Sequence, residues 1–168
     1  IQYYDWVPLV MEETILSLDV RVPSQEETDL ARKYLRENLK TPKPQTLEEV
    51  YARETVLLAE GPPKRALKLQ AIRLGALGIA AIPNETYSST GLTIKKESPL
   101  KTFTIELANG CEGYIPPPEQ HKLGGYTTWR ARTSCLEEQA EPKIRETILK
   151  LLRQVAGARA AEKPIPSK

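Results

Sequence analysis

The stretch of the sequence best suited to chemistry runs from Leu107 to Trp129. It reads Leu-Ala-Asn-Gly-Cys-Glu-Gly-Tyr-Ile-Pro-Pro-Pro-Glu-Gln-His-Lys-Leu-Gly-Gly-Tyr-Thr-Thr-Trp and contains the only histidine of the chain, His121. Turn-forming residues and aromatics crowd this segment without the periodicity of a helix or a strand. We expect a loop that begins where a strand ends, which is where α/β proteins place their sites. The alternative is a proline-rich surface loop whose tyrosines only pack.

Three side chains in and near this loop are candidates for a binding or catalytic site. Glu85 follows the apolar run Ile79–Ile82 closely, so its carboxylate loses hydration unless a cation, a metal ion or a helix N-terminus compensates it. Capping of the next helix by Asn84 or Glu85 is the alternative. Tyr114 and Tyr126 each follow a glycine, which lets the backbone approach a ligand and directs the phenol into a pocket. Simple packing of both tyrosines remains open.

The two cysteines, Cys111 and Cys135, are too few for a disulfide scaffold and lack the spacing of a zinc ribbon. We expect two small packed thiols instead of a bridge. Cys111 as a nucleophile with His121 as its base would make a cysteine hydrolase. One cysteine and one histidine in the same loop are weak evidence for such an enzyme.

Composition predicts one soluble globular domain. The chain has 168 residues, of which 40% are hydrophobic and 27% charged. The net charge of +2, with acids and bases interspersed, excludes nucleic acid as the expected partner. No apolar run reaches the roughly 18 residues of a transmembrane segment, and no signal peptide is recognisable.

The ends of the sequence give two further expectations. The chain opens on Ile1 and its only methionine is Met11, so we expect the polypeptide to extend upstream. Residues 1–156 are expected to form one α/β domain or half-domain, and residues 157–168 a flexible tail.

The hydrophobic pattern predicts alternating strands and helices. The expected elements are a strand at 16–22, helices starting at the capping boxes Ser24/Glu27 and Thr46/Glu49, a hairpin at 67–74 and 77–82, a helix at 87–96, a strand at 102–107 and a helix from Pro142. In the helix that starts at Ser24, Leu30 is expected on the apolar stripe. The strand Ile79–Ile82 is expected to be buried on both faces, and Phe103, Ile105 and Leu107 to share the buried face of theirs.

This order predicts an α/β fold with a mixed sheet and flanking helices. If the strands at 79–82 and 102–107 are neighbours joined by the helix between them, the connection is a right-handed crossover. It would place Asn84, Glu85 and the 109–126 loop side by side at one edge of the sheet.

A set of short motifs recurs here in a specific order. These are Pro83-Asn84-Glu85 followed by Gly91, then Ala108-Asn109-Gly110, Gly113-Tyr114, Pro118-Glu119-Gln120-His121 and Gly124-Gly125-Tyr126-Thr127-Thr128-Trp129. In order and spacing they resemble the C-terminal half of the catalytic domain of neutral ceramidases, most closely the bacterial ceramidase-like proteins. The resemblance covers roughly residues 65–152 and implies that the chain is the C-terminal half of a larger α/β catalytic domain.

The resemblance implies a zinc amidohydrolase. Neutral ceramidases split the amide of ceramide into sphingosine and a fatty acid, with a zinc ion held by two histidines, a glutamate and a tyrosine. By resemblance, Glu85 and Tyr114 are metal ligands, and Tyr126 is the catalytic tyrosine that contacts the reacting centre. The family's two histidines lie far upstream, and His121 matches neither. The implied partners are a lipid-like N-acyl amide and the upstream part of the same protein, and the implied location is secreted or periplasmic.

Some positions depart from the family pattern. Asn84 replaces the usual glycine, Cys111 stands where an aromatic is frequent, and residues 1–60 carry little resemblance. Because the histidine ligands are missing, we expect residues 1–168 alone to be inactive and the longer parent protein to be the hydrolase.

A function of a different class remains as the alternative. The chain would then be a non-catalytic binding or assembly module. It would dock on a partner through the aromatic cluster Tyr3, Tyr4 and Trp6, and the loop would serve only as a lid.

Overall fold

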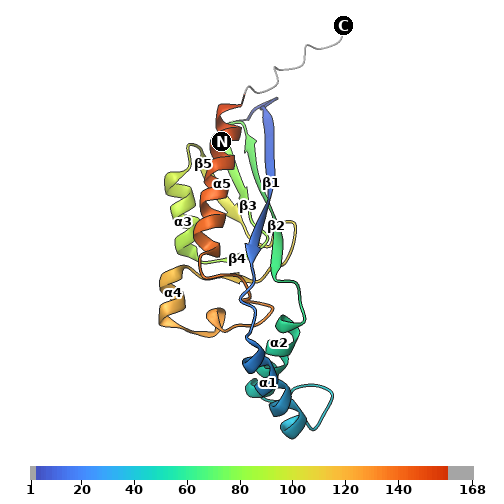
Figure 1. The fold of residues 1–168 in the computed structure, drawn as a ribbon. Helices are drawn as coiled ribbons and strands as arrows, with labels where there is room; N and C mark the ends of the chain where they lie inside the picture. The colour runs from blue at the N-terminus through green and yellow to red at the C-terminus, as the bar shows by residue number, and fades with distance from the viewer. Residues whose placement is uncertain (1–2, 159–168) are drawn as a thin grey trace.

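The centre of the molecule is a four-stranded mixed sheet with the strand order β1-β2-β3-β5. The computed structural model, drawn in Figure 1, describes residues 3–158. The strands are β1 (Leu9–Asp19), β2 (Lys64–Leu74), β3 (Leu77–Ala81) and β5 (Lys101–Ile105). β1, β2 and β3 pair antiparallel, whereas β5 pairs parallel to β3. The predicted α/β class with a mixed sheet and flanking helices is confirmed.

Two connections between strands follow the sequence pattern closely. β2 and β3 form the predicted hairpin, and its turn needs Gly75, whose φ of +61° is a conformation that other residues rarely adopt. β3 is joined to its parallel neighbour β5 through helix α3 (Ser88–Glu97). The carboxyl ends of β3 and β5 therefore lie at the same end of the sheet.

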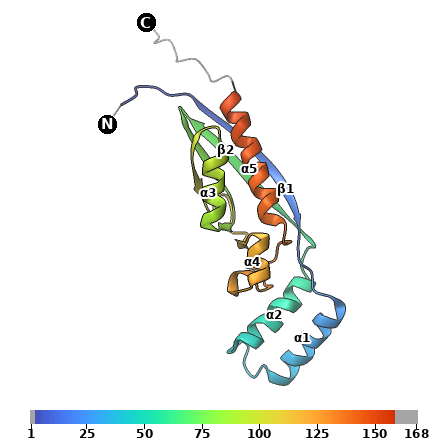
Figure 2. The same cartoon turned by 90° about the vertical axis from the view of Figure 1, so that its left-hand side faces the viewer.

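Helices cover one face of this sheet. Figures 1 and 2 show α3 and α5 (Ala140–Gly157) lying along the same side. The apolar stripe of α5 predicted from the sequence is buried, and it packs on Leu67, Leu69 and Ala71 of β2. The stripe consists of Ile144, Ile148, Leu151, Leu152 and Val155. This contact forms the hydrophobic core.

The opposite face of the sheet is apolar but largely uncovered, and we call it the open face. Met11, Ile72, Ile79 and Phe103 lie directly opposite one another on successive strands, so they form one row across the sheet. Met11 is 54% exposed at one end of this row and Phe103 is 41% exposed at the other. The open face comprises Leu9, Met11, Ile15, Ile72, Leu74, Leu77, Ile79, Phe103 and Ile105.

The expected buried face of β5 is therefore wrong. Thr102 is buried against the helices, whereas Phe103 and Ile105 point to the open face. The expected burial of Ile79–Ile82 on both faces is confirmed for Ala80, Ala81 and Ile82, whereas Ile79 is only half-buried. Leu107 lies outside β5 in a left-handed conformation, with a φ of 52°. The alternation was identified correctly, but a sequence pattern does not reveal which face receives a covering layer.

The first strand also differs from its prediction. β1 starts at Leu9 instead of Leu16 and ends at Asp19. Val20 forms only an isolated bridge with Leu136, and Val22 is exposed. β1 is longer because it pairs along its whole length with the long strand β2.

Helices α1 (Gln25–Asn38) and α2 (Leu47–Ala59) form a helical hairpin between β1 and β2, projecting beyond the sheet (Figure 2). Both predicted capping boxes are present, at Ser24 and Thr46. Leu30 does not lie on a buried stripe, because it is 61% exposed; Thr28 and Ala31 are buried instead. Among the apolar side chains of the hairpin, Ala31 and Leu58 are buried, whereas Leu30, Leu47 and Val50 are exposed.

The C-terminal helix ends at Gly157. The flexible tail expected from residue 157 lies, from residue 159 onward, outside the described residues. Among residues 3–158, no helix combines the length and apolar character needed to cross a bilayer.

Leu152→Ala is expected to lower the free energy of unfolding by about 3 kcal/mol, because it leaves a cavity in the core. Leu152 is fully buried, whereas Leu92 on α3 is 64% exposed. The matched control Leu92→Ala is expected to change stability by less than about 0.5 kcal/mol. Urea unfolding followed by circular dichroism measures both, and similar losses would contradict the proposed core.

Candidate functional site

Glu85 and Tyr114 lie opposite each other in a separate parallel ladder beyond the end of β3. The ladder joins β4 (Glu85–Thr86) to β6 (Tyr114–Ile115), and Figure 1 shows β4 next to the sheet. The backbone N–H of Glu85 donates to the carbonyl of Gly113 at 3.0 Å. The N-cap of α3 is Tyr87, without a side-chain cap. The alternative in which Asn84 or Glu85 caps this helix is therefore wrong.

Tyr126 completes this group of side chains. It begins the short 3-10 helix η1 (Tyr126–Thr128), and its hydroxyl donates to the Tyr114 hydroxyl at 2.5 Å. The two rings meet edge to face, with their centroids 5.3 Å apart. The structure thus brings together Glu85, Tyr114 and Tyr126, which we call the Glu85 cluster.

Hydrogen bonds connect the three oxygen-bearing side chains of the Glu85 cluster through Tyr114. The hydrogen bond with Tyr126, and after it the hydrogen bond to the Glu85 carboxylate, raises the pKa of the Tyr114 hydroxyl above its usual range. A phenolate beside a carboxylate would bring two negative charges together, so the phenol keeps its proton. A cation between these two oxygens would replace that proton.

Asn84 shapes the backbone around the Glu85 cluster. Its side chain is fully buried, and its Nδ2 donates to the carbonyls of Glu112 and Gly113 at 3.1 and 3.2 Å. Its Oδ1 is buried without a hydrogen-bond partner. Gly113 has a φ of +74°, and a Cβ at this position would lie 2.3 Å from the Thr133 carbonyl oxygen. Asn84 and Gly113 therefore fix the turn that presents Tyr114.

The helical hairpin holds the segment that follows Tyr126. The Glu54 carboxylate accepts hydrogen bonds from the backbone N–H, Nε and Nη2 of Arg132, at 3.0, 2.9 and 2.8 Å. The rings of Tyr51 and Trp129 meet edge to face, with their centroids 5.4 Å apart. Sequence reasoning missed Tyr51 and Glu54 as site residues. The only signal was that both lie on one face of α2.

Tyr51 also lies near the Glu85 cluster. Burial raises the pKa of its hydroxyl, and the proximity of Tyr126 adds to this effect. The hairpin of α1 and α2 therefore forms part of the wall of the candidate site through Tyr51.

His121 and Cys111 do not form a catalytic pair here. His121 lies on α4 (Pro118–Leu123). Burial, and then the nearby charge of Arg21, lowers the pKa of its imidazole. Cys111 is exposed and Cys135 is buried, and both are free thiols. Packing is thus confirmed for Cys135 and wrong for Cys111. No hydrogen bond joins Cys111 to His121 within residues 3–158.

The donors of the Glu85 cluster fit part of a metal site. A carboxylate and a phenol oxygen in contact are hard oxygen donors of the kind that zinc accepts beside nitrogen ligands. Structural and catalytic zinc sites need three or four protein ligands. Among the described residues, no group of three or more histidine, cysteine, aspartate or glutamate side chains is arranged to hold a metal ion. The Glu85 cluster offers two oxygen donors, and a zinc ion there would need further ligands from elsewhere.

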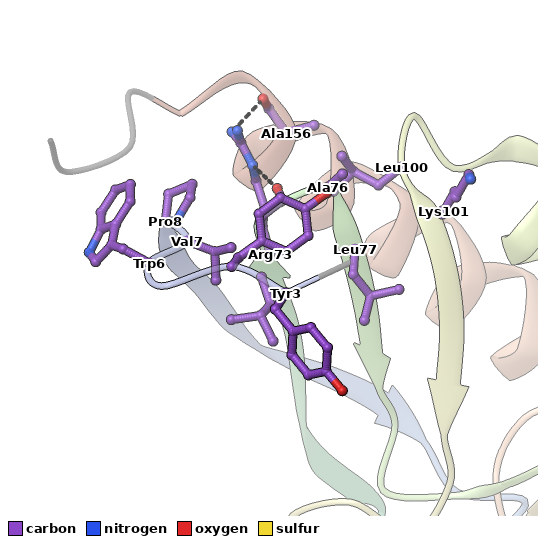
Figure 3. A pocket seen from close by; sticks show the side chains of 13 residues that line it. Tyr3, Trp6, Val7, Pro8, Arg73, Ala76, Leu77, Leu100, Lys101 and Ala156 are labelled. Carbon is purple, nitrogen blue, oxygen red and sulfur yellow. Dashed lines mark hydrogen bonds between the residues drawn. The ribbon is translucent and has the colours of Figure 1, made fainter. Parts of the chain in front are cut away.

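A cavity lies at the end of β3 that is opposite to the Glu85 cluster. It has a volume of about 1000 Å³ and is bordered by Tyr3, Tyr4, Trp6 and Leu77 (Figure 3). Arg73 lies at its wall and donates to the Ala156 carbonyl at 3.1 Å. The aromatic cluster singled out in the sequence thus lines this cavity. The cavity shares no residue with the Glu85 cluster.

Comparison with known proteins gives a likeness of fold. No protein-family model matches the chain, and no curated protein matches it. The chain is similar to the crystal structure of neutral ceramidase from Pseudomonas aeruginosa, with a TM-score of 0.51 and 18% identity over 91% of this chain and 30% of that one. It is also similar to a ceramidase complexed with C2, with a TM-score of 0.50 and 17% identity over 75% of this chain and 22% of that one. The chain therefore spans less than a third of either structure.

Asn84→Ala is expected to lower the free energy of unfolding by about 1–2 kcal/mol, because it removes two buried donors to the loop. Asn38, whose side chain bonds only its own helix at the surface, provides the control Asn38→Ala. That variant is expected to lose less than about 0.5 kcal/mol. Chemical denaturation compares the two, and equal losses would show that Asn84 does not clamp the loop.

A second expectation concerns the stability of the protein at low pH. The ion pair with Arg130, and then the capping hydrogen bond at Ser24, lower the pKa of Glu27 from 4.5 to about 2. A carboxyl whose pKa is depressed by folding stabilises the protein above pH 4.5, and this stabilisation is lost as the pH falls toward 2. Glu27→Gln is therefore expected to be roughly 0.5–1 kcal/mol less stable than the parent at pH 7, a difference that closes at low pH.

The control for this pH dependence is Glu26→Gln, which removes the adjacent carboxylate. Glu26 has no ion pair among the described residues. Thermal unfolding of the parent and both variants between pH 2 and 7 tests the linkage. A Glu27→Gln deficit that is independent of pH would rule it out.

Proposed function

We propose that the chain is part of a zinc-dependent amide hydrolase that resembles neutral ceramidase. In this proposal Glu85 and Tyr114 are two of the metal ligands, and Tyr126 is the catalytic tyrosine. The observation that carries it is the Glu85 cluster itself, in which a carboxylate and two phenols from separate segments share hydrogen bonds. The likeness of fold to a solved neutral ceramidase supports the same conclusion.

Each side chain has a distinct task in amide hydrolysis. Zinc held by Glu85 and Tyr114 would supply Lewis acidity that favours attack of water on the amide carbonyl. The Glu85 carboxylate would lower the net charge of the site, and Tyr114 would offer its oxygen as a ligand in the deprotonated form, its proton released to solvent. Tyr126 keeps its hydroxyl proton and donates it as a hydrogen bond to the oxyanion that develops on the carbonyl.

The surroundings of Tyr126 favour a substrate with hydrocarbon chains. Leu123, Tyr126 and Trp129 are 79%, 56% and 45% exposed. Such a concentration of exposed apolar side chains beside a polar centre suits an N-acyl amide that is lipid-like. The two remaining metal ligands are expected to be histidines from the preceding part of a longer polypeptide, which would be secreted or periplasmic.

Two tyrosine variants of the longer natural protein test this function. Tyr114→Phe is expected to lose metal and activity together, because it removes a ligand. Tyr126→Phe is expected to keep the metal and to lose about 10²- to 10³-fold in turnover, the usual effect of one oxyanion donor. Hydrolysis of an N-acyl amide is assayed with zinc content measured on the same samples.

The isolated chain provides the matched comparison. Residues 1–168 are expected to bind zinc weakly and to hydrolyse no amide, because they lack the histidine ligands. Tight stoichiometric zinc binding in calorimetry of this chain would refute the shared site. Full metal content and activity in both tyrosine variants would show that the tyrosines only pack.

A further inference from the structure

The open face has the composition of an interior surface. Its central row, formed by Met11, Ile72, Ile79 and Phe103, crosses all four strands. An antiparallel sheet with one face in water normally carries polar side chains on that face. Exposed apolar patches of this kind mark surfaces that contact another molecule or another part of the protein.

The orientation of the side chains on β5 shows the interior character of the open face most directly. On β5 the threonine Thr102 packs against the helices, whereas Phe103 and Ile105 are directed away from them and are 41% and 43% exposed. If the helical side were the only covered side, the opposite arrangement would be more stable by the hydrophobic contribution of both side chains. The sequence of β5 therefore suits a strand with a layer on each face.

The chain itself covers the open face only toward its two ends. At one end, Leu74 and Leu77 line the cavity that Tyr3 and Tyr4 border. The other end lies under the loop that follows β5. Asn109 in the loop after β5 donates to the Gln70 side chain at 2.7 Å, and Ala81 in this region is 4% exposed. Polar groups also gather here, since Gln70 donates to Glu13 at 2.6 Å. Neither the loop after β5 nor the hydrogen bonds of Gln70 extend to the central row, which includes Met11 and Phe103.

We propose that the open face packs against a second layer from the same polypeptide, the part that supplies the zinc histidines. This inference rests on the proposed function. The similar ceramidase structures extend far beyond the matched region, which is 30% and 22% of their chains. Within the Glu85 cluster, Glu85 lies four residues after the end of β3, a strand of this face. A layer on the open face can therefore reach the cluster with its own ligands.

A second copy of this chain is a poorer occupant. Its only histidine is His121, which lies on α4, outside the strands of the open face. A dimer through the open face would bury the apolar row but add no histidine ligand to the Glu85 cluster. Completion of the site thus favours a different segment as the covering layer.

Met11 provides a direct probe, because it is the only methionine of the chain and lies in the central row. Hydrogen peroxide transfers one oxygen atom to its thioether sulfur and leaves as water. In residues 1–168 alone, Met11 is expected to oxidise readily. In the longer natural protein that contains these residues, the covering layer is expected to slow the oxidation of Met11 about tenfold or more. Mass spectrometry of the Met11 peptide measures both rates, and urea-unfolded samples give the unprotected rate.

Paired variants locate the contact. Phe103→Glu is expected to restore Met11 oxidation in the longer protein, because a carboxylate in the interface would be desolvated. Leu92→Glu, at an exposed apolar position on α3, is expected to leave the protection unchanged. In residues 1–168 alone both variants are expected to remain folded, since Phe103 and Leu92 are 41% and 64% exposed there. Circular dichroism of the short variants checks this.

The outcomes separate this inference from the proposed function. Equal Met11 oxidation in the short and long proteins would overturn the inference, even if the longer protein binds zinc and hydrolyses amides. Protection of Met11 without zinc binding would support the layer and contradict the hydrolase. Protection that appears in residues 1–168 alone as their concentration rises, together with a dimer in sedimentation, would assign the face to a second copy and overturn the inference.

Discussion

The side-chain amide of Asn84 joins the two segments of the chain that carry Glu85 and Tyr114. Its donors reach the carbonyls of Glu112 and Gly113, so the chain leaving β3 is tied to the chain entering β6. Backbone hydrogen bonds from Glu112 to Pro83 and from Glu85 to Gly113 join the same two segments, and Glu85 and Tyr114 are neighbours in the resulting ladder. The chain thus uses a side chain to brace this turn.

The sequence predicted the elements well because their signals are local. The capping boxes at Ser24 and Thr46 involve residues within one helical turn, and both are present. The hairpin turn at Gly75 is equally local. The meeting of Glu85 with Tyr114 could be anticipated because parallel neighbouring strands end together.

Contacts between distant segments could not be predicted in this way. Glu54 and Arg132 are 78 positions apart, and nothing in either local pattern points to the other. The same applies to the orientation of β5, whose apolar side faces outward in this chain. Its alternation was visible in the sequence. Which face of the sheet the apolar side chains of β5 occupy depends on the layers that cover the sheet. The sequence of β5 alone does not contain that information.

The pairing of Val20 with Leu136 has a consequence for how the protein forms during synthesis. The bridge joins the end of the first strand to a residue just before the last helix, and Arg21 bonds the carbonyls of Thr128 and Ser134. Closing so long a loop costs only modestly more entropy than closing a shorter one, but it requires both ends to be present. On the ribosome the hairpin of α1 and α2 therefore emerges before its anchors, and the wall of the site assembles only after residues 128–136 have left the exit tunnel.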